Sequence, residues 1–260
     1  LGNFFQAPDA EPKEDVFLGT GRLRVDFPLA GSALAVHGGL GGDLYDGFDP
    51  SLYLFIGSRW HPGIHRLEAA ASFRTRSPRG EVGDSIGWAD VLIASVSYGI
   101  RPVRAFEIQA LAEMDRQVYS QKAERDNHAI RLGGAFRFFG LGYVLSPEVG
   151  AARGVRDVKA NEEDYDERIW WITLRSVPAP PLYLSLRYRT RLRSYSLDQE
   201  GSGNFGREDD RRDLTLTAEL DLSRRWSWTV YLSLQTAEST KVSRTFDTQY
   251  LWSGLSYTIG

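Results

Sequence analysis

The sequence contains no cysteine and has no long run of apolar residues. Without cysteine the chain has no disulfide scaffold, no thiolate zinc site and no cysteine nucleophile. No apolar run approaches the roughly 18 residues that a membrane-spanning helix needs, which excludes a helical membrane protein. An excess of basic residues is also absent, because the 260 residues carry a formal charge of -3 and a pI near 5.9, which disfavours a nucleic-acid-binding domain.

The remaining composition is that of a folded chain. Hydrophobic residues make up 42% and charged residues 25%, a balance that excludes intrinsic disorder. The length allows one or two domains with a large core. The chain begins with Leu1, and no charged-then-apolar segment follows, so we expect a processed or trimmed product.

The informative pattern is strict alternation of apolar and polar residues over long segments. In Leu182–Arg193, leucines occupy one parity, while Arg187, Arg189, Arg191 and Arg193 occupy the other. Successive side chains of a strand point to opposite faces, so such a segment has one apolar face and one polar face. Alternation is equally clear in Gly21–Phe27, Arg66–Thr75, Phe106–Asp115 and Asp213–Leu222, and weaker in Leu34–Gly42, Leu52–Trp60, Leu92–Ile100, Ile130–Phe138, Tyr143–Ala151, Trp170–Ser176, Trp228–Gln235 and Leu251–Ile259. The sequence therefore predicts an all-β fold.

The segments between the predicted strands alternate in length. The short ones are Pro28–Ser32, His61–His65, Arg101–Arg104, Gly140–Gly142, Pro178–Pro181 and Ser223–Trp226. The long polar ones are Asp43–Ser51, Thr75–Ser85, Ser120–Asn127, Arg156–Glu167, Tyr195–Asp210 and Thr236–Phe246. Short periplasmic turns that alternate with long external loops are typical of outer-membrane barrels.

A soluble sandwich or lipocalin-like barrel shows the same alternation with the two faces reversed. Two features favour the membrane interpretation. Aromatic residues gather near the short turns, as a membrane-interface girdle requires: Phe27, Trp60, Tyr98, Phe106, Phe138, Tyr143, Trp228 and Tyr257. A water-facing sheet also has no need of four alternating arginines on one strand, whereas inside a lumen they would have partners.

On this alternation, these turn lengths and this girdle, the chain resembles the outer-membrane β-barrel proteins of Gram-negative bacteria, the porin-like class. The resemblance covers nearly the whole chain but includes no family-specific motif. It implies a transmembrane antiparallel up-and-down barrel of about 14 strands, or about 12, located in the outer membrane with membrane lipid around it. Residues 1–13 would be an N-terminal segment and residues 14–260 the barrel. An even strand number requires a further strand, for which Gly2–Ala7 is the candidate, with Pro8–Lys13 as the first loop.

With the apolar face outward, the polar face lines a lumen in which basic residues outnumber acidic ones. The residues that we predict to line the solute path are Arg187, Arg189, Arg191, Arg193, Arg131, Arg137, Glu107, Glu113, Asp115, Asp213, Glu219 and Asp221. One interpretation is a wall stiffened by cross-strand ion pairs, in which the arginines of Leu182–Arg193 meet the acids of the next strand. The other is an arginine ladder that attracts anionic solutes.

Motifs typical of enzymes or metal sites occur without their usual context. Gly83–Gly87 fits G-x-S-x-G but enters a strand rather than forming a strand-to-helix elbow. His61 and His65 flank a tight turn with no carboxylate nearby in sequence, and His37 is predicted to point inward. We therefore predict no catalytic residue, no metal site, no cofactor and no enzymatic activity.

Three functional hypotheses remain. The first is a channel for small hydrophilic solutes, anionic ones included. The second is a non-conducting structural or anchoring barrel within a larger cell-envelope complex, with other envelope proteins as partners. An enzyme is the third. No nucleic-acid partner is predicted, and the sequence does not indicate an oligomeric state.

Overall fold

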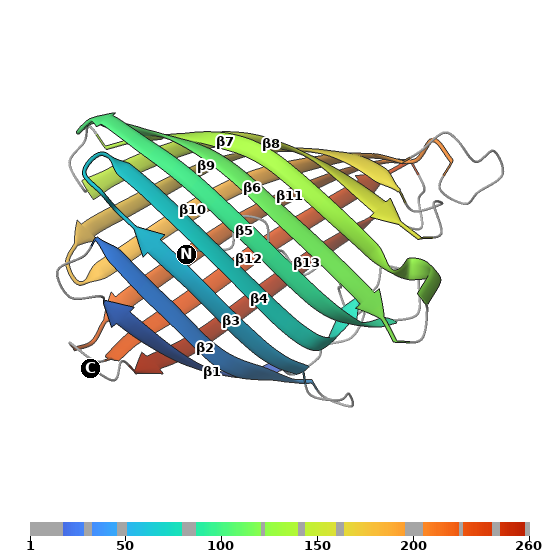
Figure 1. Cartoon of the computed structure of the whole chain (residues 1–260), viewed down its shortest axis with the longest axis horizontal. Helices are drawn as coiled ribbons and strands as arrows, with labels where there is room; N and C mark the ends of the chain where they lie inside the picture. Colours follow the sequence, from blue (N-terminus) through green and yellow to red (C-terminus); the bar gives the residue numbers. More distant parts are fainter. Residues whose placement is uncertain are drawn as a thin grey trace.

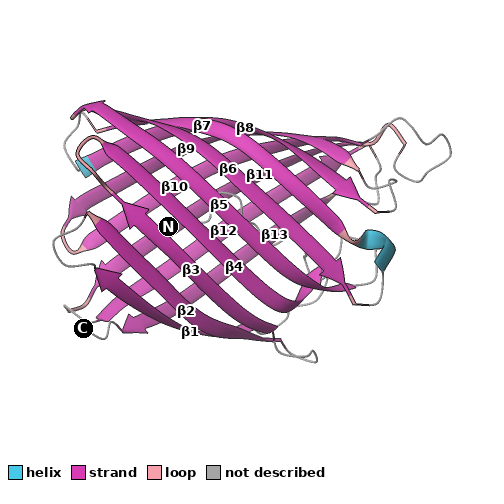
Figure 2. Ribbon diagram, viewed as in Figure 1, coloured by secondary structure: helices cyan, strands magenta, loops and turns pink. Residues whose placement is uncertain are grey.

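A computed structural model of the chain describes residues 18–28, 33–45, 51–79, 87–120, 123–139, 144–159, 164–195, 205–223, 226–240 and 245–257. Most of these residues form β-strands, and η1 is a short 3-10 turn (Figures 1 and 2). The elements are β1 (Leu18–Pro28), β2 (Leu34–Tyr45), β3 (Ser51–Trp60), β4 (His65–Arg79), β5 (Gly87–Val103), β6 (Phe106–Tyr119), η1 (Ala123–Arg125), β7 (Asn127–Phe138), β8 (Leu145–Val158), β9 (Tyr165–Ala179), β10 (Leu182–Tyr195), β11 (Glu208–Asp221), β12 (Trp226–Ser239) and β13 (Phe246–Tyr257). Within these ranges, no helix has the length and apolar character to cross a membrane.

The strands form one antiparallel sheet in which each strand pairs with the next along the chain, from β1 to β13. Figure 1 shows the strands at the front crossing those behind at a steep angle, so the sheet curls around an interior. The up-and-down all-β fold is therefore confirmed, and every predicted segment has its strand. The strand proposed for Gly2–Ala7, and the N-terminal segment 1–13, lie outside the described residues, so the count of 14 strands stays a prediction.

The two faces of the sheet differ in polarity, as the sequence predicts. Leu132 and Leu251, on the outward face, are 61% and 71% exposed. Glu148 and Glu167, on the inward face, are each only 1% exposed. A water-soluble protein rarely exposes such a continuous apolar surface, whereas a membrane barrel requires one. Apolar residues therefore face out and charged residues face in.

Several strands extend further toward the long loops than predicted. β9 begins at Tyr165 rather than Trp170, and β11 begins at Glu208 rather than Asp213. In these extensions the outward residues are charged too, for example Asp166 and Arg168, so no apolar face marks the strand. The physical reason is that a strand can continue past the apolar zone, where its outer side chains no longer need to be apolar. The predicted loops Arg156–Glu167 and Tyr195–Asp210 are correspondingly shorter in the structure.

Candidate functional site: the charged inner face

The inward charges fall into two groups at different ends of the strands. We call the end that carries the long connections the loop side and the other end the turn side. The loop-side network consists of Glu113, Asp115, Arg131, Arg156, Glu167, Arg189, Arg191, Arg193 and Asp213, all of them buried. The turn-side arc consists of Arg59, Arg66, Glu68, Glu107, Arg137, Glu148 and Arg175.

Glu167 holds the centre of the loop-side network. One carboxylate oxygen accepts a hydrogen bond from Arg131 Nε at 2.9 Å and the other from Arg193 Nε at 3.0 Å. Arg131 also donates from Nη1 to Glu113 at 2.8 Å. Arg131 and Glu167 lie on β7 and β9, and both are paired in register with Gly154 on the strand between them. Because Gly154 has no side chain, the ion pair can span the intervening strand.

A second part of the network is centred on Asp213 of β11. Arg189 donates to one oxygen of Asp213 from Nε at 2.9 Å and from Nη2 at 2.6 Å, and Arg191 lies 3.4 Å from the same oxygen. Arg156 and Asp115 add a pair at 3.1 Å. The cross-strand ion pairing predicted from the sequence is therefore present on this part of the wall.

The predicted acidic partners of the arginine column need correction. In the strand register Arg189 faces Asp213, as expected, but Glu219 faces Tyr183 and Asp221 lies at the end of β11. Glu219 and Asp221 thus lie on the inner face but away from the arginines. Glu167, which the sequence interpretation placed in a loop, supplies the missing carboxylate instead. Continuing the parity of Trp171 back along the strand would have identified it.

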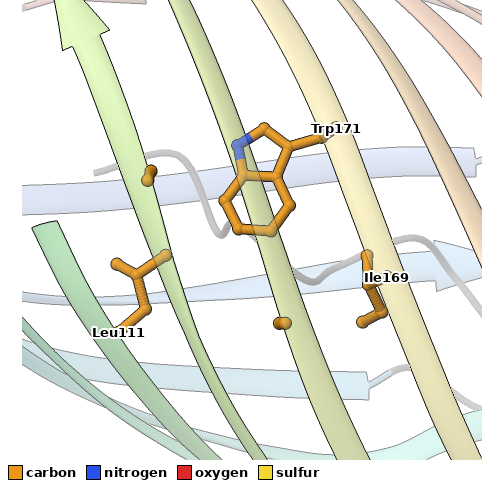
Figure 3. Close-up of a cluster of buried hydrophobic side chains, with 5 residues drawn as sticks. Leu111, Ile169 and Trp171 are labelled. Carbon is orange, nitrogen blue, oxygen red and sulfur yellow. The ribbon is translucent and has the colours of Figure 1, made fainter.

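An apolar layer separates the two charged groups on β6 to β9. It consists of Leu111, Ala135, Ala152, Ile169 and Trp171, and the Trp171 side chain has no exposed surface. Figure 3 shows the indole reaching from β9 across the neighbouring strand toward Leu111. Gly150, opposite Trp171, makes this possible, because a Cβ there would lie 2.1 Å from the indole. The alternation in Phe106–Asp115 puts Leu111 on the polar face of its strand, and the structure places it there within the apolar layer.

The turn-side arc is a series of ion pairs along β3 to β9. Arg59 contacts Glu68 at 2.9 Å, and Arg66 contacts Glu107 at 2.6 Å. Glu148 accepts from Arg137 at 2.5 Å, from Arg175 at 2.8 Å and, through its other oxygen, from Trp171 Nε1 at 3.0 Å.

Arg187 is half-buried between the two groups and lies over the Trp171 ring, 5.6 Å from its centroid. The structure therefore brings ten of the predicted lumen residues into these pairs or beside them, and leaves Glu219 and Asp221 apart.

The predicted girdle faces outward at every described position. Trp60, Tyr98, Phe138 and Trp228 are exposed, and Phe106, half-buried, stacks on Phe136. Tyr143 lies outside the described residues. Phe27 and Tyr257 are placed on strands, but their side chains are not described.

The enzyme-like motifs gain little from the structure. Residues 83–86 of the G-x-S-x-G string lie outside the described ranges. His37 is buried and points inward against Gly57, as predicted. His61 lies 3.7 Å from Glu68, a carboxylate that the sequence interpretation did not associate with it. In the part of the chain that the structure describes, no three His, Asp or Glu side chains gather in a way that could hold a metal ion.

Comparison with solved structures identifies the architecture. A loop-deletion mutant of OmpT, an outer membrane protein of Vibrio cholerae, superposes with a TM-score of 0.50 at 11% sequence identity, covering 92% of this chain and all of that chain. The fold is that of an outer-membrane β-barrel protein. The predicted class is thus confirmed, and a location in the outer membrane agrees with this fold and with the apolar outer face.

Two further structures match less closely. In-vitro folded OmpT of Vibrio cholerae gives a TM-score of 0.48 at 11% identity, covering 93% of this chain and 96% of that chain. An anion-selective porin from Comamonas acidovorans gives 0.45 at 8% identity, covering 92% and 87%. No protein-family model and no curated protein sequence matches the chain.

Proposed function

We propose that the chain is an outer-membrane channel that admits small hydrophilic solutes through a narrow path beside the charged wall. The observation that carries this proposal is an unequal inner face. The loop-side inner residues of β6 to β11 are largely buried, but toward the turn side of β11 and β12, and at Tyr250 of β13, inner side chains remain accessible: Thr215, Thr217 and Thr229 are half-buried, and Glu219 and Tyr250 are exposed. A polar and accessible inner strip is what an aqueous path needs.

Closure of the barrel is part of this proposal. β1 and β13 are the outermost strands of the described sheet, and both run from the loop side toward the turn side. Direct pairing of the two would therefore be parallel, whereas single-chain bacterial barrels have an even number of antiparallel strands. A further strand would restore the even number, so our prediction of about 14 strands stands with this proposal.

The test is single-channel recording of the refolded chain in a planar bilayer. Because the chain has no cysteine, one can be introduced at a chosen position and modified from the water phase. We expect steady conductance steps from the unmodified chain. For the T217C variant we expect a bulky methanethiosulfonate reagent to reduce the step size, because the modified side chain would lie in the path.

Leu216 provides a matched control, since it precedes Thr217 on the same strand and faces outward. The L216C variant should keep its step size under the same reagent. Equal sensitivity of the two variants would contradict a path along the inner face of β11.

The non-conducting structural or anchoring barrel remains the second candidate. It is favoured by the fully buried Trp171 and by the buried loop-side network, because both occupy volume that an open pore would leave to water. A chain that migrates on gels as a folded barrel but never conducts would support this candidate over the channel. We propose no enzymatic activity, and assays for hydrolase activity on lipids and peptides would test that.

A further inference from the structure

The two partners of each ion pair in the turn-side arc differ in exposure, which a count of charges does not show. Within each pair the carboxylate is buried and the arginine side chain is the more exposed partner. Side-chain exposure is 41% for Arg59 against 8% for Glu68, and 20% for Arg66 against 8% for Glu107. For Arg137 and Arg175 it is 12% and 37%, against none for their shared partner Glu148.

The carboxylates are held at the wall by further contacts. Glu148 accepts a hydrogen bond from the buried Trp171 indole, and Glu107 accepts one from Gln109 on its own strand. Arg66 reaches Glu107 over Gly99 of the intervening strand, where a Cβ would lie 2.9 Å from the Glu107 carboxylate. An arginine side chain is longer than a glutamate side chain, so its charged end projects beyond the carboxylate that it neutralises.

We propose that the turn-side arc forms a cationic vestibule that draws small anionic solutes, carboxylates and phosphates, into the turn-side end of the channel. Arg59, Arg66, Arg137 and Arg175 present their charge to the interior, and His61, 46% exposed beside Glu68, adds a further polar group. Accessible positive charge of this kind raises the local concentration of anions and can bind carboxylate or phosphate through several donors. This inference rests on the proposed function for its route of solute entry.

Two carboxylates at the same end weaken the attraction of anions. Glu219 is exposed and Asp221 half-buried on the inner face of β11, whereas Arg187, half-buried on β10, adds positive charge. The accessible surface therefore changes sign across the interior, from positive along β3 to β9 to negative on β11. The vestibule attracts anions along the first of these surfaces.

The first experiment reads the local potential directly and does not depend on conduction. Ser185 is half-buried on the inner face and pairs in register with Arg175, so the S185C variant places a thiol beside the arc. We expect this thiol to react faster with an anionic methanethiosulfonate than with a cationic one. Adding Arg175→Gln should lower the rate with the anionic reagent about fivefold, the effect of one unit charge at close range in water, and raise the rate with the cationic reagent by a similar factor, so that the ratio falls about 25-fold.

A matched probe faces the acidic side. Thr229 is half-buried on β12 and pairs in register with Glu219. The T229C variant should show a lower anion-to-cation rate ratio than the S185C variant, and Glu219→Gln should raise it. Equal ratios at the two positions, or no response to Arg175→Gln in a chain that still migrates as a folded barrel, would overturn the proposal.

The second experiment measures the reversal potential of single channels in a KCl gradient, with chloride as the anion probe. We expect a preference for chloride that falls in the Arg59→Gln and Arg175→Gln variants and rises in the Glu219→Gln variant. A conducting channel that prefers potassium would overturn the vestibule while leaving the channel in place. A silent barrel with the expected rate ratios would overturn the channel while supporting the cationic surface.

Discussion

The loop-side network and the turn-side arc are made of the same two chemical groups, guanidinium and carboxylate, but they differ in what they present to the interior. In the loop-side network both members of a pair are buried, as in Arg193 and Glu167, with 3% and 2% of their side chains exposed. In the turn-side arc the carboxylate is buried and the arginine is partly exposed, as in Arg175 and Glu148, at 37% and none. The first arrangement fills the wall with buried ion pairs. The second leaves positively charged side chains accessible at the wall.

This difference means that the charge of a lumen cannot be read from a count of its residues. A buried pair with both charges hidden contributes little to the potential that a solute meets, whereas a pair with one accessible member is a dipole whose positive end faces the solute. The four arginines from Arg187 to Arg193 dominate the sequence pattern, yet Arg189, Arg191 and Arg193 are buried. Within the turn-side arc the arginines with the most exposed side chains are Arg59 and Arg175, each of them the only inward-facing arginine of its strand.

The sharpest test of the comparison removes one carboxylate from each group. Glu167→Gln would leave Arg131 and Arg193 buried without their shared anion, which should cost about 3–5 kcal/mol of unfolding free energy. Glu148→Gln should cost less, because Arg175 is already partly exposed and can be hydrated. Urea unfolding in lipid vesicles measures both. A larger loss for Glu148→Gln would contradict the distinction between the groups.

The comparison also assumes that the inner face of the sheet meets water. Two adjacent residues of β11 can test this assumption. Leu216→Arg puts a charge on the outward face and should cost about 2–4 kcal/mol if that face meets the lipid interior. Thr217→Arg puts the same charge at nearly the same depth on the inner face, where we expect a loss below about 1 kcal/mol. The measurement is again urea unfolding in vesicles, and similar losses for the two variants would contradict the assignment of faces.

The smallest expected effect concerns the apolar layer that separates the two groups. Gly150→Ala would place a methyl group against the Trp171 indole and should cost about 1–3 kcal/mol through overpacking. It should also disturb the hydrogen bond from Trp171 to Glu148 and so alter the turn-side arc. Gly38→Ala is the control, because its Cβ would meet only Phe55 O, at 3.4 Å. Unfolding midpoints of the two variants, compared in vesicles, decide the outcome.

Much of the fold was predictable because a strand repeats every two residues. The parity of the leucines in Leu182–Arg193 is enough to assign one face, and the same argument placed Glu113, Arg131 and Asp213 on the inner face, where they lie. The prediction was incomplete where the apolar face ended before the strand did. Tyr165–Ile169 and Glu208–Arg212 have charged residues on both faces, so the alternation of apolar and polar residues disappears although the strand continues.

The sequence by itself determined which side chains share a face, because alternation along an extended chain is a local property. Which charges meet was decided by the tertiary structure. Arg66 pairs with Glu107 and Arg131 with Glu167 across an intervening strand, over Gly99 and Gly154. Such contacts depend on the register of three strands and on a missing side chain in the middle one. Exposure follows from the same packing, so only the folded sheet shows which arginines a solute could reach.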